Sequence, residues 1–265
     1  MNFSSPGPIG VFDSGYGGLT VLEKLREVLP SYDYIYLGDN ARTPYGSRSF
    51  EVVYEYTLQC VRRLFAMGAH LVILACNTAS AKALRSIQQN DLAAIDPSRR
   101  VLGVIRPSVE QVGELTRSNK VGIFGTSGTV QSQSYPMEIH KLFPKIEVFQ
   151  EACPMWVPLV ENMEFNRPGA DYFVQQHVDQ LLSRCNQIDS IILGCTHYPL
   201  LLPKIEASLP RHVKLLEQGY VVADSLRDYL VRHPEMAAKC SKNGAVHFYT
   251  TENPQKFSMT AGRFF

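Results

Sequence analysis

A repeated spacing of short apolar runs is the feature that most constrains the fold of this chain. Eight runs alternate with helix-length segments, which is typical of α/β proteins with mainly parallel sheets. From origins at residues 9 and 121, the second runs start at 34 and 146 and the fourth at 101 and 213, so the offsets agree. This repetition predicts an internal duplication into two pseudo-symmetric α/β halves. The runs are 9–12, 34–37, 71–74, 101–104, 121–124, 146–149, 191–194 and 213–216.

Charge and cysteine usage narrow the kind of partner. The formal net charge of +1 gives no electrostatic reason to expect nucleic acid or an anionic membrane. No apolar run approaches the roughly 18 residues of a membrane span, and the start has no secretory pattern. The six cysteines form no C-x-x-C pair. We therefore expect a cytoplasmic protein with reduced thiols, a small-molecule ligand and no nucleic-acid or membrane partner.

Two of the cysteines occupy corresponding places in the two halves. LVILACNT and IILGCTHY are the third runs of each series, and they bring Cys76 and Cys195 to the end of a predicted strand. One such cysteine is readily explained as a small core residue. Two at the same position, each followed by a helix-starting hydroxyl, favour a functional role. The other cysteines (60, 153, 185 and 240) have no counterparts, and we interpret them as structural.

The loops after the predicted strands should meet at one cleft. In an open parallel sheet, ligands bind beyond the carboxyl ends of the strands. Helix starts and hydroxyl groups in these loops favour a small ligand that carries carboxylates, although serine and threonine are also common helix caps. If the halves face each other, the two cysteines stand on opposite walls. The loops are 13–18, 38–47, 76–80, 125–129, 150–161 and 195–199.

Two other interpretations are weaker. The turn Gly15-Tyr16-Gly17-Gly18 resembles a dinucleotide fingerprint, but Thr20 stands where the last glycine is needed. Zinc bound by Cys76, Cys195 and His197 would need a C-x-H spacing that is uncommon, and no further ligand pair is evident. We therefore predict no metal site.

Paired thiols suit proton transfer at a stereocentre. A helix start lowers the pKa of a thiol from about 8.5, so a thiolate is available as a base. One nucleophilic cysteine with a histidine would suffice for hydrolysis, and its duplicate would be redundant. Two thiols on opposite faces of a carbon can instead remove a proton from one side and deliver one to the other. This layout needs no organic cofactor, and no phosphate-binding signature suggests pyridoxal phosphate.

The motifs resemble those of cofactor-independent glutamate racemases, within the aspartate/glutamate racemase superfamily. The resemblance extends from about residue 9 to 216, and it rests on GVFDSGYGGLTVL, YLGDNARTPYGSRS, ACNTAS, GTSGTVQSQSY and LGCTHYPLL. CTHYP is the most specific of these, because related aspartate racemases usually carry an acidic residue in place of His197.

The resemblance implies a role for each matching residue. Cys76 would deprotonate D-glutamate with help from Asp13, and Cys195 would deprotonate L-glutamate. His197 and Glu161 would assist Cys195, although Glu161 could equally be a solvent-facing helix residue. The implied substrate-binding residues are Asp13, Ser14, Tyr45, Gly46, Asn77, Thr78, Thr126, Thr129, Thr196 and His197.

The resemblance also implies an architecture and a biological role. We expect a first domain of residues 1–104 plus 213–265, because the C-terminal segment returns to it, and a second domain of residues 105–212, with the active site between them. The role would be to supply D-glutamate for peptidoglycan. A racemase of another small acid, such as aspartate or a hydantoin, and a noncatalytic carboxylate-binding protein are the alternatives. A homodimer is compatible with the sequence, which does not fix the oligomeric state.

Overall fold

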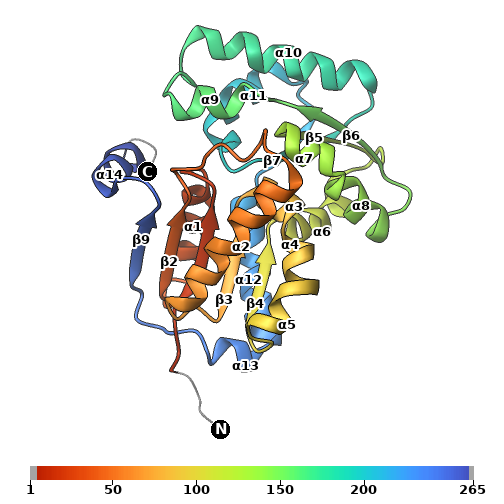
Figure 1. The fold of residues 1–265 in the computed structure, drawn as a ribbon. Helices are drawn as coiled ribbons and strands as arrows, with labels where there is room; N and C mark the ends of the chain where they lie inside the picture. The colour runs from red at the N-terminus through yellow and green to blue at the C-terminus, as the bar shows by residue number, and fades with distance from the viewer. Residues whose placement is uncertain (1–4, 263–265) are drawn as a thin grey trace.

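A computed structural model describes residues 5–262, and within them the chain forms two separate sheets whose strands are all parallel (Figure 1). The first sheet has the order β4-β3-β1-β2-β9 and the second has the order β6-β5-β7-β8. The four strands β1 to β4 therefore recur as β5 to β8 in the same spatial order. The predicted fold class, an α/β protein with two similar halves, is confirmed.

The strands lie close to the predicted runs. In the first sheet Val11 pairs with Tyr36 on one side and Ile73 on the other, and in the second Ile123 pairs with Gln150 and Ile192. The strands are β1 (Ile9–Asp13), β2 (Tyr34–Gly38), β3 (Leu71–Leu74), β4 (Arg100–Gly103), β5 (Lys120–Gly125), β6 (Glu147–Ala152), β7 (Ser190–Gly194), β8 (Lys214–Leu216) and β9 (Val246–Thr250).

Helices cover both faces of each sheet, so the central strands are buried on both sides. In the first half, α1 (Gly18–Val28) and α12 (Gln218–Arg232) pack on the face of Val11 and Ile73. Helix α2 (Phe50–Ala66) packs on the face of Phe12 and Leu74. In the second half, α9 (Trp156–Glu161) and α10 (Pro168–Arg184) cover Phe124 and Leu193. Helices α6 (Ile105–Leu115) and α8 (Ser134–Leu142) cover the opposite face. Alternate side chains of each strand thus enter different cores.

The main helices lie in the helix-length segments that separate the predicted runs. Leu19, Leu22 and Leu25 of α1 are buried, and α2 ends just before Gly68, whose φ of +98° suits glycine. The larger helices are α1 (Gly18–Val28), α2 (Phe50–Ala66), α6 (Ile105–Leu115), α8 (Ser134–Leu142), α10 (Pro168–Arg184) and α12 (Gln218–Arg232). The shorter ones are α3 (Asn77–Lys82), α4 (Leu84–Ser86), a π-helix η1 (Ile87–Asp91), α5 (Leu92–Ile95), α7 (Ser127–Ser132), α9 (Trp156–Glu161), a 3₁₀-helix η2 (Tyr198–Leu201), α11 (Leu202–Ser208), α13 (Pro234–Ala237) and α14 (Pro254–Ala261).

The structure differs from the prediction over residues 150–161. This segment was expected to be a loop, but β6 continues to Ala152 and α9 occupies Trp156–Glu161. Burial explains the helix, because Trp156 is fully buried between Phe124 and Tyr198. The loop that faces the site is therefore only about three residues long.

The chain crosses between the halves twice, once after β4 and once after β8. Because β8 pairs with β7 in the second sheet, the return to the first half begins later than the predicted boundary at 213. The duplication itself explains this, since β8 is the counterpart of β4. After α12, strand β9 adds to the first sheet beside β2. Residues 1–4 and 263–265, which the predicted first domain includes, lie outside the described residues.

A search of the helices within residues 5–262 finds none that combines the length and apolar character needed to cross a membrane.

Candidate active site

The two predicted cysteines stand at the carboxyl ends of corresponding strands. Cys76 follows β3 and caps α3, whereas Cys195 follows β7 at a turn that leads into η2. Both thiols are buried, and they are close enough that Cys195 is among the groups that raise the pKa of Cys76. The third strands of the two halves therefore bring their terminal thiols to one region, as the duplication predicts.

A small cavity of about 190 Å³ lies at these strand ends. It is smaller than the roughly 300 Å³ at which pockets for drug-sized molecules begin, so only a compact ligand fits. Hydroxyl groups and backbone atoms from both halves form its polar lining. The predicted site residues that line it are Ser14, Tyr45, Gly46, Thr78, Thr126, Cys195, Thr196 and His197. Asp13, Cys76, Asn77, Thr129 and Glu161 are bonded to these residues or adjacent to them in the chain.

Cys76 has a hydroxyl and a carboxylate beside it. Its thiol donates a hydrogen bond to Oγ of Ser14 at 3.5 Å. The neighbouring Asp13 is fully buried, accepts from the backbone N–H of Gly15 at 2.8 Å, and has its pKa raised by burial.

Burial raises the pKa of the Cys76 thiol to about 12, and the nearby Asp13 adds to the rise. The N–H of Ala79 in the first turn of α3 acts in the opposite direction, but it is outweighed. The predicted lowering of this pKa by the helix start is therefore wrong for Cys76. The thiol stays protonated near neutral pH and is equipped to give up a proton.

Cys195 has a histidine and a carboxylate beside it. Nδ1 of His197 lies 3.8 Å from the Cys195 sulfur, and Nε2 lies 3.0 Å from Oε1 of Glu161. Burial alone would lower the pKa of His197, but its bonds to Cys195 and Glu161 prevail and raise it to about 10. A side-chain relay thus runs from Glu161 through His197 to the thiol, an arrangement that can hold or move a proton.

The two halves approach closely at this point. A Cβ on Gly17, in the loop after β1, would lie 2.5 Å from Nδ1 of His197, which explains the glycine. Thr196 donates from its hydroxyl to Oδ1 of Asp13 at 3.3 Å. The carboxylate beside one thiol is therefore bonded to the residue that follows the other thiol.

Three threonine hydroxyls form a second bridge between the halves. Oγ1 of Thr78, in α3, lies 2.9 Å from Oγ1 of Thr126 and 3.4 Å from that of Thr129. Thr126 also caps α7 by accepting from the N–H of Thr129 at 3.2 Å. These hydroxyls can rotate to bind a carboxylate, because each can donate as well as accept.

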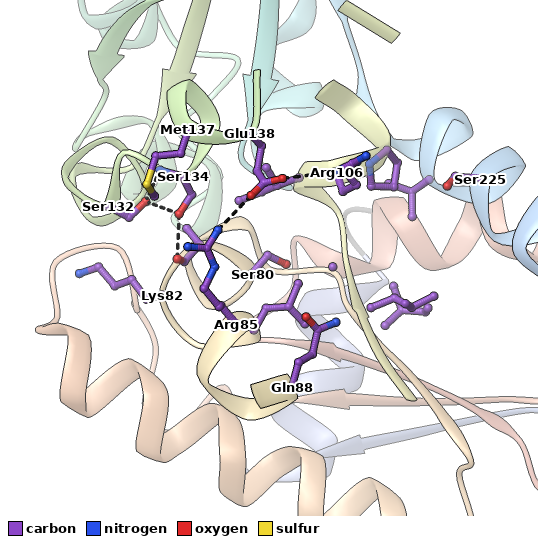
Figure 2. Close-up of a pocket in the computed structure, with 18 of the residues that line it drawn as sticks. Ser80, Lys82, Arg85, Gln88, Arg106, Ser132, Ser134, Met137, Glu138 and Ser225 are labelled. Carbon is purple, nitrogen blue, oxygen red and sulfur yellow. Dashed lines mark hydrogen bonds and ion pairs between the residues drawn. The ribbon is translucent and has the colours of Figure 1, made fainter. Parts of the chain in front are cut away.

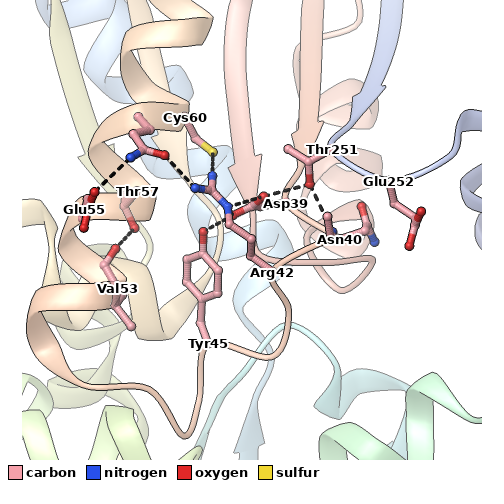
Figure 3. Close-up of polar contacts among 12 residues, drawn as sticks. Asp39, Asn40, Arg42, Tyr45, Val53, Glu55, Thr57, Cys60, Thr251 and Glu252 are labelled. Atoms are coloured by element: carbon pink, nitrogen blue, oxygen red, sulfur yellow. Dashed lines mark hydrogen bonds and ion pairs between the residues drawn. The ribbon is translucent and has the colours of Figure 1, made fainter.

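The loop 38–47 is fixed by a buried carboxylate (Figure 3). Tyr45 donates its hydroxyl to Asp39, which also accepts from Nε of Arg42 at 2.7 Å and from Thr251 at 2.8 Å. The Tyr45 hydroxyl thus anchors the loop. Gly46 approaches the second half, where its carbonyl accepts from the N–H of Gly128 at 2.7 Å.

The C-terminal segment supports the site loops from outside. Thr251, which follows β9, holds Asp39 as described above, and Phe257 of α14 stacks on Tyr16 with ring centroids 5.3 Å apart. Tyr16 belongs to the glycine-rich loop after β1. The segment that returns to the first half therefore buttresses two of the loops around the cavity.

Several lining residues were not predicted. Cys153, interpreted as structural, lines the cavity together with Thr43, Pro44, Pro154 and Val157. The duplication offered a signal for Cys153, because it follows β6 in the second half as the loop 38–47 follows β2 in the first. A further unpredicted feature is a hydrogen-bonded ring that joins Asn77 to Tyr135 and Gln218. Within residues 5–262, no three His, Cys, Asp or Glu side chains are grouped as metal ligands.

A larger cavity of about 590 Å³ contains none of the predicted site residues (Figure 2). It opens between α4 of the first half and α6 and α8, which pack on the second sheet. Arg85 and Arg106 converge there on Glu138, at 3.1 and 3.4 Å. These pairs are half-exposed and belong to the periphery of the contact between the halves.

Fold and cavity together define a class: an α/β protein of two similar halves that line one small cavity, with a strand-end thiol from each half close to it. The family profile described as Asp/Glu/Hydantoin racemase matches residues 9–224. The chain belongs to this family, and the predicted membership is confirmed.

Individual relatives agree with the family match. The chain is 38% identical over 256 residues to the glutamate racemase of Geobacter metallireducens, covering 97% of this chain and 92% of that protein. A glutamate racemase structure from Bacillus anthracis has a TM-score of 0.84 at 35% identity, covering 97% of this chain and 93% of that one. The Francisella tularensis enzyme, solved with D-glutamate, has a TM-score of 0.84 at 34% identity, covering 98% and 93%. The prediction of an amino-acid racemase, an isomerase, is confirmed by these relationships.

Proposed function

We propose that this protein is a glutamate racemase that works by two-base proton transfer, with Cys76 and Cys195 on opposite faces of the α-carbon. The observation that carries this proposal is the approach of two thiols from corresponding strand ends: Cys195 lines the small cavity, and Cys76 is bonded to Ser14, which lines it too. The relatives named as glutamate racemases support the choice of substrate. The roles of the individual residues follow from their contacts.

For L-glutamate, Cys195 acts as the thiolate base and Cys76 as the acid. Cys195 removes the α-proton on its side, and the electron pair is left at the α-carbon. Cys76, whose pKa is raised to about 12 by burial, then donates its proton to the opposite face, which gives D-glutamate. The thiol of Cys195 and the thiolate of Cys76 remain, ready for the reverse reaction.

The enzyme must reset before a second turnover in the same direction. The proton on Cys195 has to leave and another has to reach Cys76. On one side His197, 3.8 Å from the Cys195 sulfur and bonded to Glu161, offers a path for this exchange, although its raised pKa keeps the ring protonated near neutral pH, so the ring must release a proton before it accepts one. On the other side, a proton can reach Cys76 through Ser14, which is bonded to it, or from the buried Asp13 nearby.

The hydroxyls of Ser14, Thr78, Thr126 and Thr196 would hold the two carboxylates and the amino group of the substrate. Backbone N–H groups at the starts of α3 and α7 are suited to carboxylates as well. Asn77 begins α3, and its backbone N–H joins this set.

Incubation with L-glutamate in deuterated water tests the proposal. Without any added cofactor, we expect the optical activity to decay to zero and deuterium to enter the α-position, as followed by circular dichroism and mass spectrometry. D-glutamate should behave in the same way. Faster racemisation of aspartate or a hydantoin, or dependence on pyridoxal phosphate, would contradict the substrate or the mechanism.

We also propose that the enzyme supplies D-glutamate for peptidoglycan from the cytoplasm, as a homodimer of two-domain chains. The domains would meet where the chain crosses between the sheets, after β4 and after β8. Depletion of the protein should produce a requirement for D-glutamate in the medium, and growth without it would contradict this role.

A further inference from the structure

A closed ring of three hydrogen bonds lies directly behind Cys76. Asn77 donates from Nδ2 to Oε1 of Gln218 at 2.6 Å. Gln218 donates from Nε2 to the hydroxyl of Tyr135 at 2.8 Å, and Tyr135 donates in turn to Oδ1 of Asn77 at 2.7 Å. Within the ring, every member donates one hydrogen bond and accepts one. Each bond therefore polarises the next and strengthens it.

The surroundings of the ring fix which atom donates and which accepts in each of its hydrogen bonds. Nε2 of Gln218 also faces the carbonyl oxygen of Val104 at 3.3 Å and Oγ of Ser108 at 2.7 Å. A carbonyl oxygen can only accept, so the nitrogen of the Gln218 amide must point toward Val104. Burial raises the pKa of Tyr135 well above its usual value, so its hydroxyl keeps the proton that it donates.

The ring joins elements that are far apart in the sequence. Asn77 begins α3 in the first half, Tyr135 lies in α8 of the second half, and Gln218 begins α12 just after the chain crosses back. Val104, which receives from Gln218, lies at the other crossing. All three ring members are at most 4% exposed.

We propose that Gln218 is a positioning residue for the racemase: through the ring with Tyr135 it fixes Asn77, and thereby the backbone that holds the Cys76 thiol against Ser14 at the edge of the cavity. This inference rests on the proposed function for its kinetic consequence. Buried amides without partners are costly, so Asn77 has a single favourable orientation while the ring is closed. Loss of the ring should let residues 76–78 move. It should change the reactivity of Cys76 more than that of Cys195.

Two single-hydroxyl deletions form a matched test. Tyr135→Phe opens the ring and keeps the aromatic packing. Ser108→Ala removes another buried partner of Gln218 and leaves the ring closed. Both side chains are fully buried, so the cost of a lost hydroxyl is comparable. Gln218→Met removes the amide itself, and melting temperatures identify any variant that fails to fold.

The first readout is the alkylation of Cys76 relative to Cys195 by iodoacetamide, followed by peptide mass spectrometry. We expect this ratio to rise several-fold in Tyr135→Phe and Gln218→Met and to stay within about twofold in Ser108→Ala. This measurement requires no substrate. It therefore decides the positioning role even if glutamate is not racemised, in which case the proposed function alone fails.

The second readout is kinetic. Enantiomers have equal free energies in water, so kcat/KM must fall equally in both directions, by about tenfold for a modest displacement. The α-deuterium isotope effect shows which thiol is affected. If proton transfer by Cys76 slows, the isotope effect should rise for D-glutamate, which Cys76 deprotonates in the proposed mechanism, and fall for L-glutamate. Equal behaviour of Tyr135→Phe and Ser108→Ala in both readouts would overturn the proposal.

Discussion

The two walls at the cavity, one from each half, place a thiol at the same point of a duplicated fold, yet different groups surround the two thiols. On the first wall Cys76 caps α3, with a serine hydroxyl and a buried carboxylate beside it. On the second wall Cys195 precedes a turn and a 3₁₀-helix, with His197 and then Glu161 behind it. The position of the thiol is the same in both halves, whereas the polar groups beside it differ.

The difference has a chemical consequence. Burial and Asp13 favour the protonated thiol at Cys76, while a histidine with a raised pKa stands beside Cys195. A racemase needs one acid and one base at every moment, and two identical walls would compete for the same proton state. In the proposed mechanism, the unequal surroundings would set the starting arrangement, with the proton on Cys76.

The most severe test is removal of either thiol. Cys76→Ser and Cys195→Ser should each lower kcat by about a thousandfold or more, because a serine hydroxyl is a far weaker base and acid catalysis contributes about 10² to 10⁴. Circular dichroism of glutamate gives the rate, and thermal unfolding checks the fold. Cys185→Ser, at a half-exposed cysteine outside the lining of the cavity, is the control. Full activity in either wall variant would remove the two-base mechanism.

Substitution of Asp13, beside Cys76, and of His197, beside Cys195, should have different effects on the two directions of the reaction. Asp13→Asn and His197→Asn each remove a charged hydrogen-bonding group worth about 1.5 to 3 kcal/mol, so kcat/KM should fall about 10- to 100-fold. The isotope effects should differ in direction. Asp13→Asn should raise the α-deuterium effect for D-glutamate, and His197→Asn should raise it for L-glutamate. The same pattern in both variants would mean that the two residues do not serve separate thiols.

Much of this comparison could be predicted from local sequence. Apolar runs mark the strands, and the topology of parallel sheets places their carboxyl ends together, so Cys76, Cys195 and the hydroxyl loops were found without the structure. The return of the chain was placed too early, at 213, because composition does not show which sheet a three-residue strand such as β8 joins. The helix α9 was missed because its burial depends on Trp156 meeting Phe124 and Tyr198.

Long-range packing accounts for what the sequence could not show. The raised pKa of Cys76 depends on how completely other elements exclude water, and the helix start alone suggested the opposite sign. Asn77 and Gln218 are 141 residues apart, and no local pattern links them. Electrostatics and buried polar partners of this kind depend on the folded structure.

Glu161 offers a smaller perturbation of the second wall. Its bond to His197 adds to that of Cys195, and together they raise the pKa of His197 from 6.5 to about 10, so the share of stability that Glu161 contributes is complete below pH 6.5 and is lost as the pH rises through about 10. Glu161→Gln should therefore destabilise the protein most near pH 6.5 and least near pH 10, and activity should fall several-fold. Urea unfolding across this range measures the effect. Glu164→Gln, at an exposed position three residues away, is the control, and an equal loss of stability at all pH values would contradict the role of Glu161.

The smallest effect is expected where the halves meet outside the active site. Arg85 pairs with Glu138 across the larger cavity, but the Arg85 side chain is 57% exposed (Figure 2). Exposed ion pairs contribute at most about 1 kcal/mol, so Arg85→Gln should change kcat/KM less than twofold and lower the melting temperature slightly. Salt should remove this difference by screening the pair.

Thr78→Val, which cuts the buried hydroxyl bridge between the same halves, should by contrast raise KM for glutamate severalfold. A larger kinetic effect from Arg85→Gln would show that the periphery, rather than the hydroxyl bridge at the cavity, controls how the two walls are held together.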